Sequence, residues 1–331
     1  MSNKSNSSQK KSQNIWAPIV LLVALLLTSC GAGQPKTYTI GIANETVTLS
    51  VVIETFKAEM AQLGYVEGEN VSYILSQDIL GTDPQVNEAE VRNLMAQEVD
   101  LLLTLGTAPA IAAKNVVGGT DMPVVFAPVL NPLREGIVTD ISHPGGNVTG
   151  VQSFSPGPKA LEWLLKIAPD TKQVYVPYNP ADQVALTSTK PLPEAAANLG
   201  VELILDEVGN GDEAMAAIQA LPEDSAMLLI ISPSLNQSRE PMLELATDLG
   251  IPPGGTTSQS EDQLLISYTN SLPQAGKQAA ALVDKIFKGI NPGDLPVESA
   301  ETVLTINLKI AKALGINIPD SIVSQAENII R

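Results

Sequence analysis

Histidine and cysteine are almost missing from this chain of 331 residues, which contains one of each, His143 and Cys30. A single histidine excludes metal sites built from several histidines. Nucleophilic schemes that need a histidine base would have to use this one residue. His143 stands directly before Pro144, so we expect it in a loop. One cysteine cannot form an internal disulfide, and the fold is expected to hold without one.

Nucleotide-binding signatures are also missing. The chain has no GxxxxGK[ST] phosphate loop and no GxGxxG after a predicted strand, the patterns that place main-chain amides around phosphates. Carboxylates are frequent, yet no pair stands out as an acid–base couple, which disfavours a hydrolase without excluding it. We therefore predict no catalytic residue, no metal and no cofactor.

Aromatic residues are scarce, at 4%, and basic residues are few: the chain has 19 Lys and Arg but 36 Asp and Glu. The cores must then consist mainly of Ala, Val, Ile and Leu, which suits α/β layers. Hydrophobic residues, at 44%, suffice for packed cores, and the chain length predicts about two domains. The formal net charge of −17 disfavours contact with phosphate backbones, so we expect no nucleic-acid partner.

Residues 1–29 have the features of a signal peptide. A start with three lysines and no acid precedes an apolar run at residues 15–27, which is shorter than the roughly 20 residues that span a bilayer. Leu27-Thr28-Ser29-Cys30 resembles a bacterial lipobox, in which Cys30 is lipidated and becomes the mature N-terminus. An uncleaved anchor helix is the alternative. We expect an extracytoplasmic protein, periplasmic or attached by its lipid to the outer face of the cell membrane, with residues 30–36 as a tether.

Beyond residue 37, short β-branched runs alternate with helical stretches. Asp83-Pro84 offers an N-cap and a first-turn proline to one of these helices. Leu-Gly pairs end a helix before the next strand four times, as βαβ units require. This pattern predicts an α/β fold with two doubly wound parallel-sheet lobes. The predicted strands include residues 38–43, 71–75, 101–105, 123–127, 148–152, 174–176, 203–205 and 227–231.

The division of the chain between the two lobes follows from turns and later crossover segments. The turn at residues 144–147 precedes the first boundary, and residues 264–268 and 295–303 could carry the chain between lobes. We therefore assign residues 37–150 and 268–298 to lobe 1 and residues 151–267 and 299–331 to lobe 2. The lobes are expected to be joined by a multi-strand hinge.

Candidate ligand contacts follow the predicted strands. Ligands of open parallel sheets bind outside the carboxyl ends of the strands, where helix N-termini favour anionic groups. Four short polar segments occupy such places, and Thr107 is also expected to cap the helix that follows it. The alternative is that each segment is only a loop or a cap. The candidates are Asn44, Glu45, Thr46, Gly106, Thr107, Ala108, Tyr178, Asn179, Ser232 and Ser234.

The two most specific motifs are LGYVEGENV at residues 63–71 and PGGNVTGV at residues 144–151. More generic α/β junctions accompany them at residues 105–108, 123–126, 178–180, 306–309 and 313–315. Together these stretches resemble the ABC-transporter substrate-binding family that includes tryptophan-, tyrosine- and phenylalanine-binding lipoproteins. The resemblance covers residues 38–330. It implies two lobes of the periplasmic-binding type I kind that close by a hinge around one ligand.

The chain departs from that family's pattern in two places. Asn131 stands where members often have the aspartate of Thr-Asp-Pro, and Asn270-Ser271 stands where they often carry an acid. A bound α-ammonium needs a buried carboxylate, which Glu45 or Asp182 would have to supply. An aromatic amino acid and a less cationic solute are both allowed. Two candidates are added here, Asn131 and Tyr268.

The resemblance and the predicted lobes indicate a solute-binding lipoprotein and not an enzyme. We expect a monomer that hands a small polar or amino-acid-like solute to an ABC permease with its ATPase. Two alternatives remain. One is a ligand-sensing receptor that signals to a membrane kinase, and the other is a lipid-anchored hydrolase.

Overall fold

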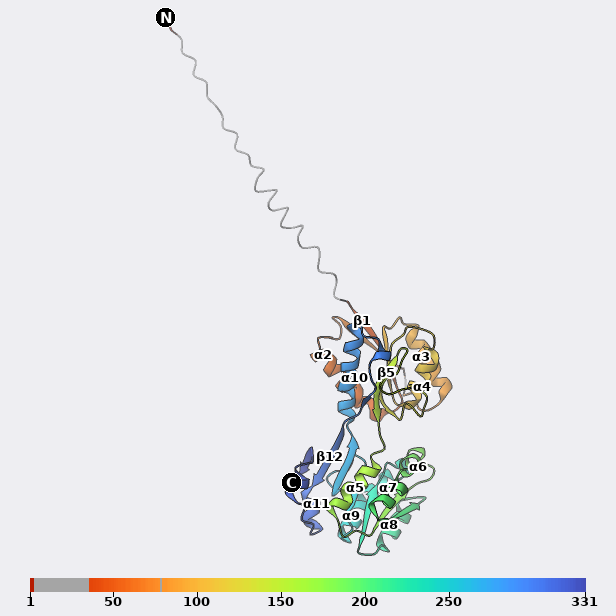
Figure 1. Cartoon of the computed structure of the whole chain (residues 1–331), viewed down its shortest axis with the longest axis vertical. Coiled ribbons are helices and arrows are strands. Elements are labelled where there is room, and N and C mark those ends of the chain that lie inside the picture. Colours follow the sequence, from red (N-terminus) through yellow and green to blue (C-terminus); the bar gives the residue numbers. More distant parts are fainter. Residues whose placement is uncertain (3–35, 78) are drawn as a thin grey trace.

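The computed structural model describes residues 1–2, 36–77 and 79–331. The predicted lipidation site Cys30, nearly all of the predicted leader and most of the tether lie outside these residues. The described residues form two lobes, one above the other in Figure 1. In this part of the chain, no helix combines the length and the apolar character needed to cross a bilayer.

Lobe 1 is built on a six-stranded sheet with strand order β11-β5-β4-β3-β1-β2, and every neighbouring pair is parallel. Helices α2 and α10 pack on one face of the sheet, and α3 and α4 pack on the other. The elements are β1 (Tyr38–Asn44), η1 (Val47–Leu49), α2 (Ser50–Gln62), β2 (Val71–Leu75), α3 (Pro84–Met95), β3 (Leu101–Leu105), α4 (Thr107–Val116), β4 (Val124–Leu130), β5 (Val148–Ser153), α10 (Leu272–Phe287), η3 (Pro292–Asp294) and β11 (Glu298–Ser299).

Lobe 2 is built on a seven-stranded sheet with strand order β13-β12-β10-β9-β8-β6-β7. Helices α5, α7 and α11 cover one face, and α8 and α9 cover the other. The elements are α5 (Gly157–Ile167), β6 (Gln173–Tyr178), α6 (Gln183–Thr189), α7 (Leu192–Leu199), β7 (Glu202–Glu207), α8 (Gly211–Gln219), β8 (Ser225–Leu229), η2 (Pro233–Ser238), α9 (Arg239–Asp248), β9 (Pro253–Gly255), β10 (Ile266–Asn270), β12 (Thr302–Asn307), α11 (Leu308–Ala313), α12 (Asp320–Val323) and β13 (Asn328–Ile330).

The predicted α/β fold with two doubly wound lobes is confirmed. A strand covered on both faces has no polar side, which explains why β3 is apolar at every position except the buried Thr104. Leu101, Leu103 and Leu105 face α2 and α10, whereas Leu102 faces α3 and α4. One pairing departs from the parallel pattern, because β10 and β12 are antiparallel.

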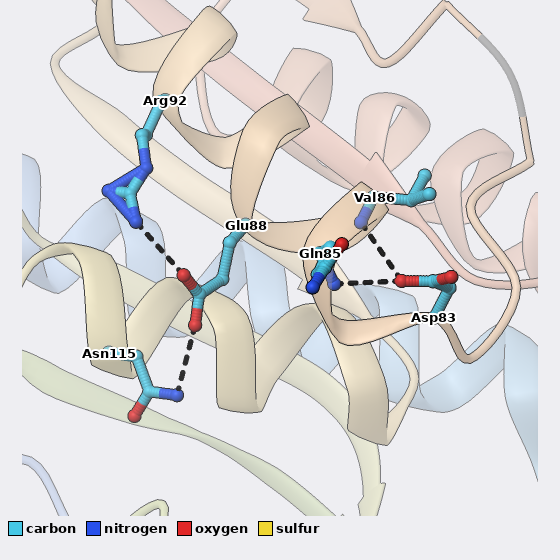
Figure 2. Close-up of polar contacts among 6 residues, drawn as sticks. All are labelled: Asp83, Gln85, Val86, Glu88, Arg92 and Asn115. Atoms are coloured by element: carbon cyan, nitrogen blue, oxygen red, sulfur yellow. Dashed lines mark hydrogen bonds and ion pairs between the residues drawn. The ribbon is translucent and has the colours of Figure 1, made fainter.

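The predicted cap of α3 is also confirmed. The Asp83 side chain accepts hydrogen bonds from the amides of the second and third residues of α3, at 2.8 and 3.2 Å, and Pro84 is the first helical residue. Figure 2 also shows Glu88 between Arg92 on its own helix and Asn115 on α4, at 2.9 and 3.5 Å. The cap begins the helix, and Glu88 links it to its neighbour on the same sheet face.

Three segments cross between the lobes: β5 leads into α5, β10 into α10, and β11 into β12. They also bond to one another. The side-chain amide of Asn270 donates to the main-chain oxygen of Phe154 at 2.8 Å. The main-chain amide of Ser271 donates to the main-chain oxygen of Glu301 at 2.8 Å. Strand β12 returns from lobe 1, so it runs opposite to β10. The lobe limits at residues 150, 268 and 299 stay a prediction.

Candidate functional site

The strand ends of the two lobes face each other. Strand β5 leaves lobe 1 at its carboxyl end and enters lobe 2, and it is parallel to the other strands of its sheet. Strand β10 leaves lobe 2 at its carboxyl end and enters lobe 1, and β8 and β6 are parallel to it through β9. Polar loops that follow β1 and β3 therefore face those that follow β6 and β8. This arrangement places the candidate residues of both lobes on facing ends.

In lobe 1, the structure brings Glu45 onto the loop that follows β3. The main-chain amide of Glu45 donates to the oxygen of Leu105 at 3.0 Å, and its Oε2 accepts a hydrogen bond from the amide of Ala108 at 3.1 Å. Burial raises the pKa of the Glu45 carboxyl, and hydrogen bonds from the amides of Ala108 and Thr107 oppose that rise. Glu45 therefore serves as an acceptor for the first turn of α4.

The prediction that Thr107 caps α4 is wrong. Thr107 is the first helical residue, the N-cap position belongs to Gly106, and the side-chain acceptor comes from Glu45, 63 residues before Ala108. Gly106 has φ 97° and ψ 173°, and a Cβ built on it would lie 2.7 Å from the Cβ of Glu45. Only glycine fits there, because both the backbone conformation and the contact with Glu45 exclude a side chain.

A cavity of about 300 Å³ opens beside this group, between the ends of β1 and β2 and the start of α2. Asn44 lines it and is 5% exposed; its Oδ1 accepts from the amide of Thr46 at 3.3 Å, and its Nδ2 lies 3.5 Å from the Oγ of Ser50. The side chain of Thr46 is exposed and caps no helix. Larger cavities of 520 and 630 Å³ lie in lobe 2, around the α5–β6 turn and around α11 and α12, and no candidate residue lines them.

In lobe 2, Tyr178 was expected in the loop after β6. The structure instead makes it the last residue of β6. Its ring is 6% exposed within the core, and its hydroxyl donates to Glu207 at 2.8 Å. Burial and the Glu207 carboxylate raise the pKa of the Tyr178 phenol. Asn179 is also engaged, since its Oδ1 accepts from the amide of Ala181 at 2.8 Å and its Nδ2 donates to the oxygen of Gly209 at 3.1 Å.

Asp182 binds both serines that were predicted as ligand contacts in lobe 2. Its carboxylate accepts from the Ser232 hydroxyl at 2.6 Å, and from the amide and hydroxyl of Ser234 at 3.0 and 2.8 Å. The Ser232 hydroxyl also accepts from the amide of Asn179 at 3.1 Å. Burial opposes ionisation of Asp182, but these three hydrogen bonds outweigh it and lower its pKa. Three side chains after β6 and β8, together with the main-chain amide of Asn179, thus form one network.

The two candidates added by resemblance lie outside these groups. Asn131 has φ 53° after β4 and accepts from the amide of Arg134 at 3.1 Å. Tyr268 is half-buried in β10, with its hydroxyl 2.9 Å from that of Thr302 on β12, in the crossing segments. We call Asn44, Glu45, Thr46, Gly106, Thr107 and Ala108 the lobe 1 exit group, and Tyr178, Asn179, Asp182, Ser232 and Ser234 the lobe 2 exit group.

Sequence reasoning missed the exposed apolar side chains around the strand exits. Large apolar residues that end or follow strands β1, β2, β4, β5, β6 and β8 are between 36% and 73% exposed. Their signal in the sequence is an apolar residue placed next to a polar exit loop, where a buried run should have ended. These side chains give the facing ends of the lobes an apolar component; they are Val47, Leu75, Ile79, Leu130, Leu133, Phe154, Val184 and Ile231.

Comparison with known proteins gives concordant results. The pattern of a family described as ABC transporter substrate binding protein matches residues 45–330. A tyrosine-binding protein of Clostridioides difficile (strain R20291) is 25% identical over 288 residues, covering 84% of this chain and 81% of the relative. The ligand-free, open structure of a substrate binding protein with adhesive properties from Clostridium difficile is 25% identical, with TM-score 0.74, covering 89% of this chain and 98% of that one. An ABC domain in complex with L-Trp from Streptococcus pneumonia, 22% identical with TM-score 0.69, covers 89% of this chain and 100% of its own, and shows the same fold.

Proposed function

Because the chain belongs to the family of ABC transporter substrate binding proteins, we propose that it captures one small solute between its lobes and delivers it to an ABC permease with its ATPase. The observation that carries this proposal is the topology. Parallel strands of both sheets end on facing sides, and three crossing segments join the lobes. Ligands of such sheets bind outside the carboxyl ends of the strands. The solute then contacts the lobe 1 and lobe 2 exit groups.

The solute class in this proposal is small, polar or amino-acid-like. The relative named a tyrosine-binding protein supports an amino-acid-like solute. Exposed apolar side chains at the facing ends favour a solute with an apolar portion. In this proposal the protein acts as a monomer. It releases the solute unchanged, because its carboxylates Glu45 and Asp182 are engaged in hydrogen bonds that hold loops.

We expect the lobes to approach each other when the right solute binds. Lobes joined by a few crossing segments move as rigid bodies about them, and a solute that contacts both ends stabilises the closed arrangement. A thermal-shift screen of amino acids, nucleosides and small organic acids identifies the solute, and small-angle scattering then measures the radius of gyration with and without it.

The radius of gyration should fall with that solute and stay constant with a screened compound that gives no thermal shift. A constant radius at saturating concentrations of a tightly bound solute would contradict closure. No stabilisation by any compound of these classes would contradict the proposed solute class.

The membrane attachment in this proposal depends on Cys30. Replacing Cys30 with serine removes the thiol that would carry the lipid, so we expect the protein to move from the membrane fraction to the soluble extracytoplasmic fraction. Folding should be unaffected, because β1, the first element of lobe 1, begins at Tyr38. Fractionation after a high-salt wash measures the distribution, and Ser29→Ala is the matched control that keeps the thiol. A Cys30→Ser protein that stays with the membrane would show that the anchor is not the lipid.

A further inference from the structure

The N-terminus of α4 faces lobe 2, and its amides of Thr107 and Ala108 are already occupied. Glu45 supplies the acceptor, at 3.1 Å from the amide of Ala108, and the Gly106 backbone lies directly against the Glu45 side chain. Helix N-termini attract anions because unpaired amides and the helix dipole meet there. In this chain, that anion is the protein's own carboxylate.

A solute carboxylate placed at the same amides would have to share them with Glu45. Two negative charges at contact distance repel each other, and more strongly where burial lowers the effective dielectric constant. Lobe 2 shows a parallel arrangement, because the Asp182 carboxylate takes the amide and the hydroxyl of Ser234. In both lobes, then, donors that face the other lobe are taken by a carboxylate of the chain.

A different helix start in lobe 1 lacks such a partner. Helix α2 begins through η1, and neither element has a side-chain hydrogen bond at its N-cap. The cavity of about 300 Å³ lies beside it. The amides of Leu49 and Ser50 donate to the main-chain oxygens of Thr46 and Val47. An anionic solute group that enters lobe 1 would therefore meet the amides of residues 47 and 48 and not those of α4.

We propose that Glu45 is a specificity-determining residue, which excludes an anionic solute group from the loop at residues 106–108 and accepts a hydrogen bond from a donor group of the solute there. A carboxylate has about four acceptor positions, and two main-chain amides of α4 use only part of them. The half-buried Glu45 therefore favours an ammonium or amide group of the solute at this place. This inference rests on the proposed function for its meaning, and its test does not need the solute.

The test is a titration of the isotope-labelled mature protein with acetate at constant ionic strength, followed by the amide NMR signals of Thr107 and Ala108. In the wild-type protein these signals should not shift saturably. In Glu45→Ala, acetate should bind at least ten times more tightly and shift both signals. Glu45→Gln keeps one acceptor and should show a smaller gain. Glu54→Ala, which removes an exposed carboxylate of α2, should behave as the wild type.

Saturable shifts of Thr107 and Ala108 in the wild-type protein would overturn the proposal, because acetate would then displace Glu45. Wild-type affinity in Glu45→Ala would also overturn it. If Glu45→Ala does not fold, the wild-type and Glu45→Gln titrations decide the question in the same way. Acetate shifts confined to residues 47 and 48 support the proposal. A solute screen without any hit would count against the proposed function and leave the acetate result standing.

Discussion

Alanine at position 106 is expected to lower the free energy of unfolding by about 3 kcal/mol or more. Gly106 has φ 97° and ψ 173°, a conformation that residues with a side chain strongly avoid. In addition, the new Cβ would overlap the Glu45 carboxylate and lie 2.7 Å from the Cβ of Glu45. Relief of that overlap requires Glu45 to leave the N-terminus of α4, so the backbone strain and the loss of the acceptor add up.

Urea unfolding followed by circular dichroism measures this loss. Gly119→Ala is the matched control, since Gly119 has φ 80° and a Cβ added there would meet nothing within 4 Å beyond its chain neighbours. That control should cost about 1–2 kcal/mol, the strain of a left-handed residue alone. Equal losses in the two variants would show that contact with Glu45 contributes nothing to the requirement for glycine at position 106.

Alanine at position 276 is expected to cost about 2 kcal/mol, although alanine normally stabilises a helix interior by about 1 kcal/mol relative to glycine. Gly276 lies in α10 where this helix meets α2. A Cβ there would lie 2.6 Å from the main-chain oxygen of Val52 and 3.0 Å from the amide nitrogen of Phe56, and would overlap the Thr55 hydroxyl. Main-chain atoms cannot rotate away, so the two helices would have to separate.

Thermal and urea unfolding of Gly276→Ala measure this cost. Adding Thr55→Ala removes the overlapping hydroxyl but not the main-chain contacts, so it should restore only part of the stability. Lys277→Ala, an exposed change in the next position of α10, should stay within about 0.5 kcal/mol of the wild type. Stabilisation by Gly276→Ala would mean that α2 and α10 can separate at little cost.

The fold could be predicted from the sequence because its signals are local. Asp83 caps α3 through amides two and three residues away, and the helix ends Gly64 and Gly200 have the positive φ expected of them, at 95° and 72°. Strand boundaries were less accurate where a buried strand has no polar end. The extension of β6 to Tyr178 is the clearest case, since it moves that ring from the expected loop into the core.

For the candidate site, the sequence suggested single residues and not the contacts between them. The rule that ligands bind at the carboxyl ends of parallel strands led to Glu45 and Thr107 separately, but not to the contact between them. That contact exists because β1 pairs with β3 in parallel register, with Asn44 opposite Leu105, which places Glu45 beside the start of α4. Local capping preferences suggested Thr107 as the cap of α4. In the tertiary structure, the longer acidic side chain of Glu45 accepts from the amides at this helix start.

The sequence by itself determined the α/β alternation, the two lobes and the family, because periodicity, helix caps and motifs depend on residues close together in the chain. The tertiary structure alone decided which groups remain available at the facing ends. Glu45 and Ala108 lie 63 positions apart, and Asp182 and Ser234 lie 52 apart. The antiparallel pairing of β10 with β12 likewise depends on a return of the chain through lobe 1. Pairings over such separations are selected by the packing of whole sheets, which no local pattern specifies.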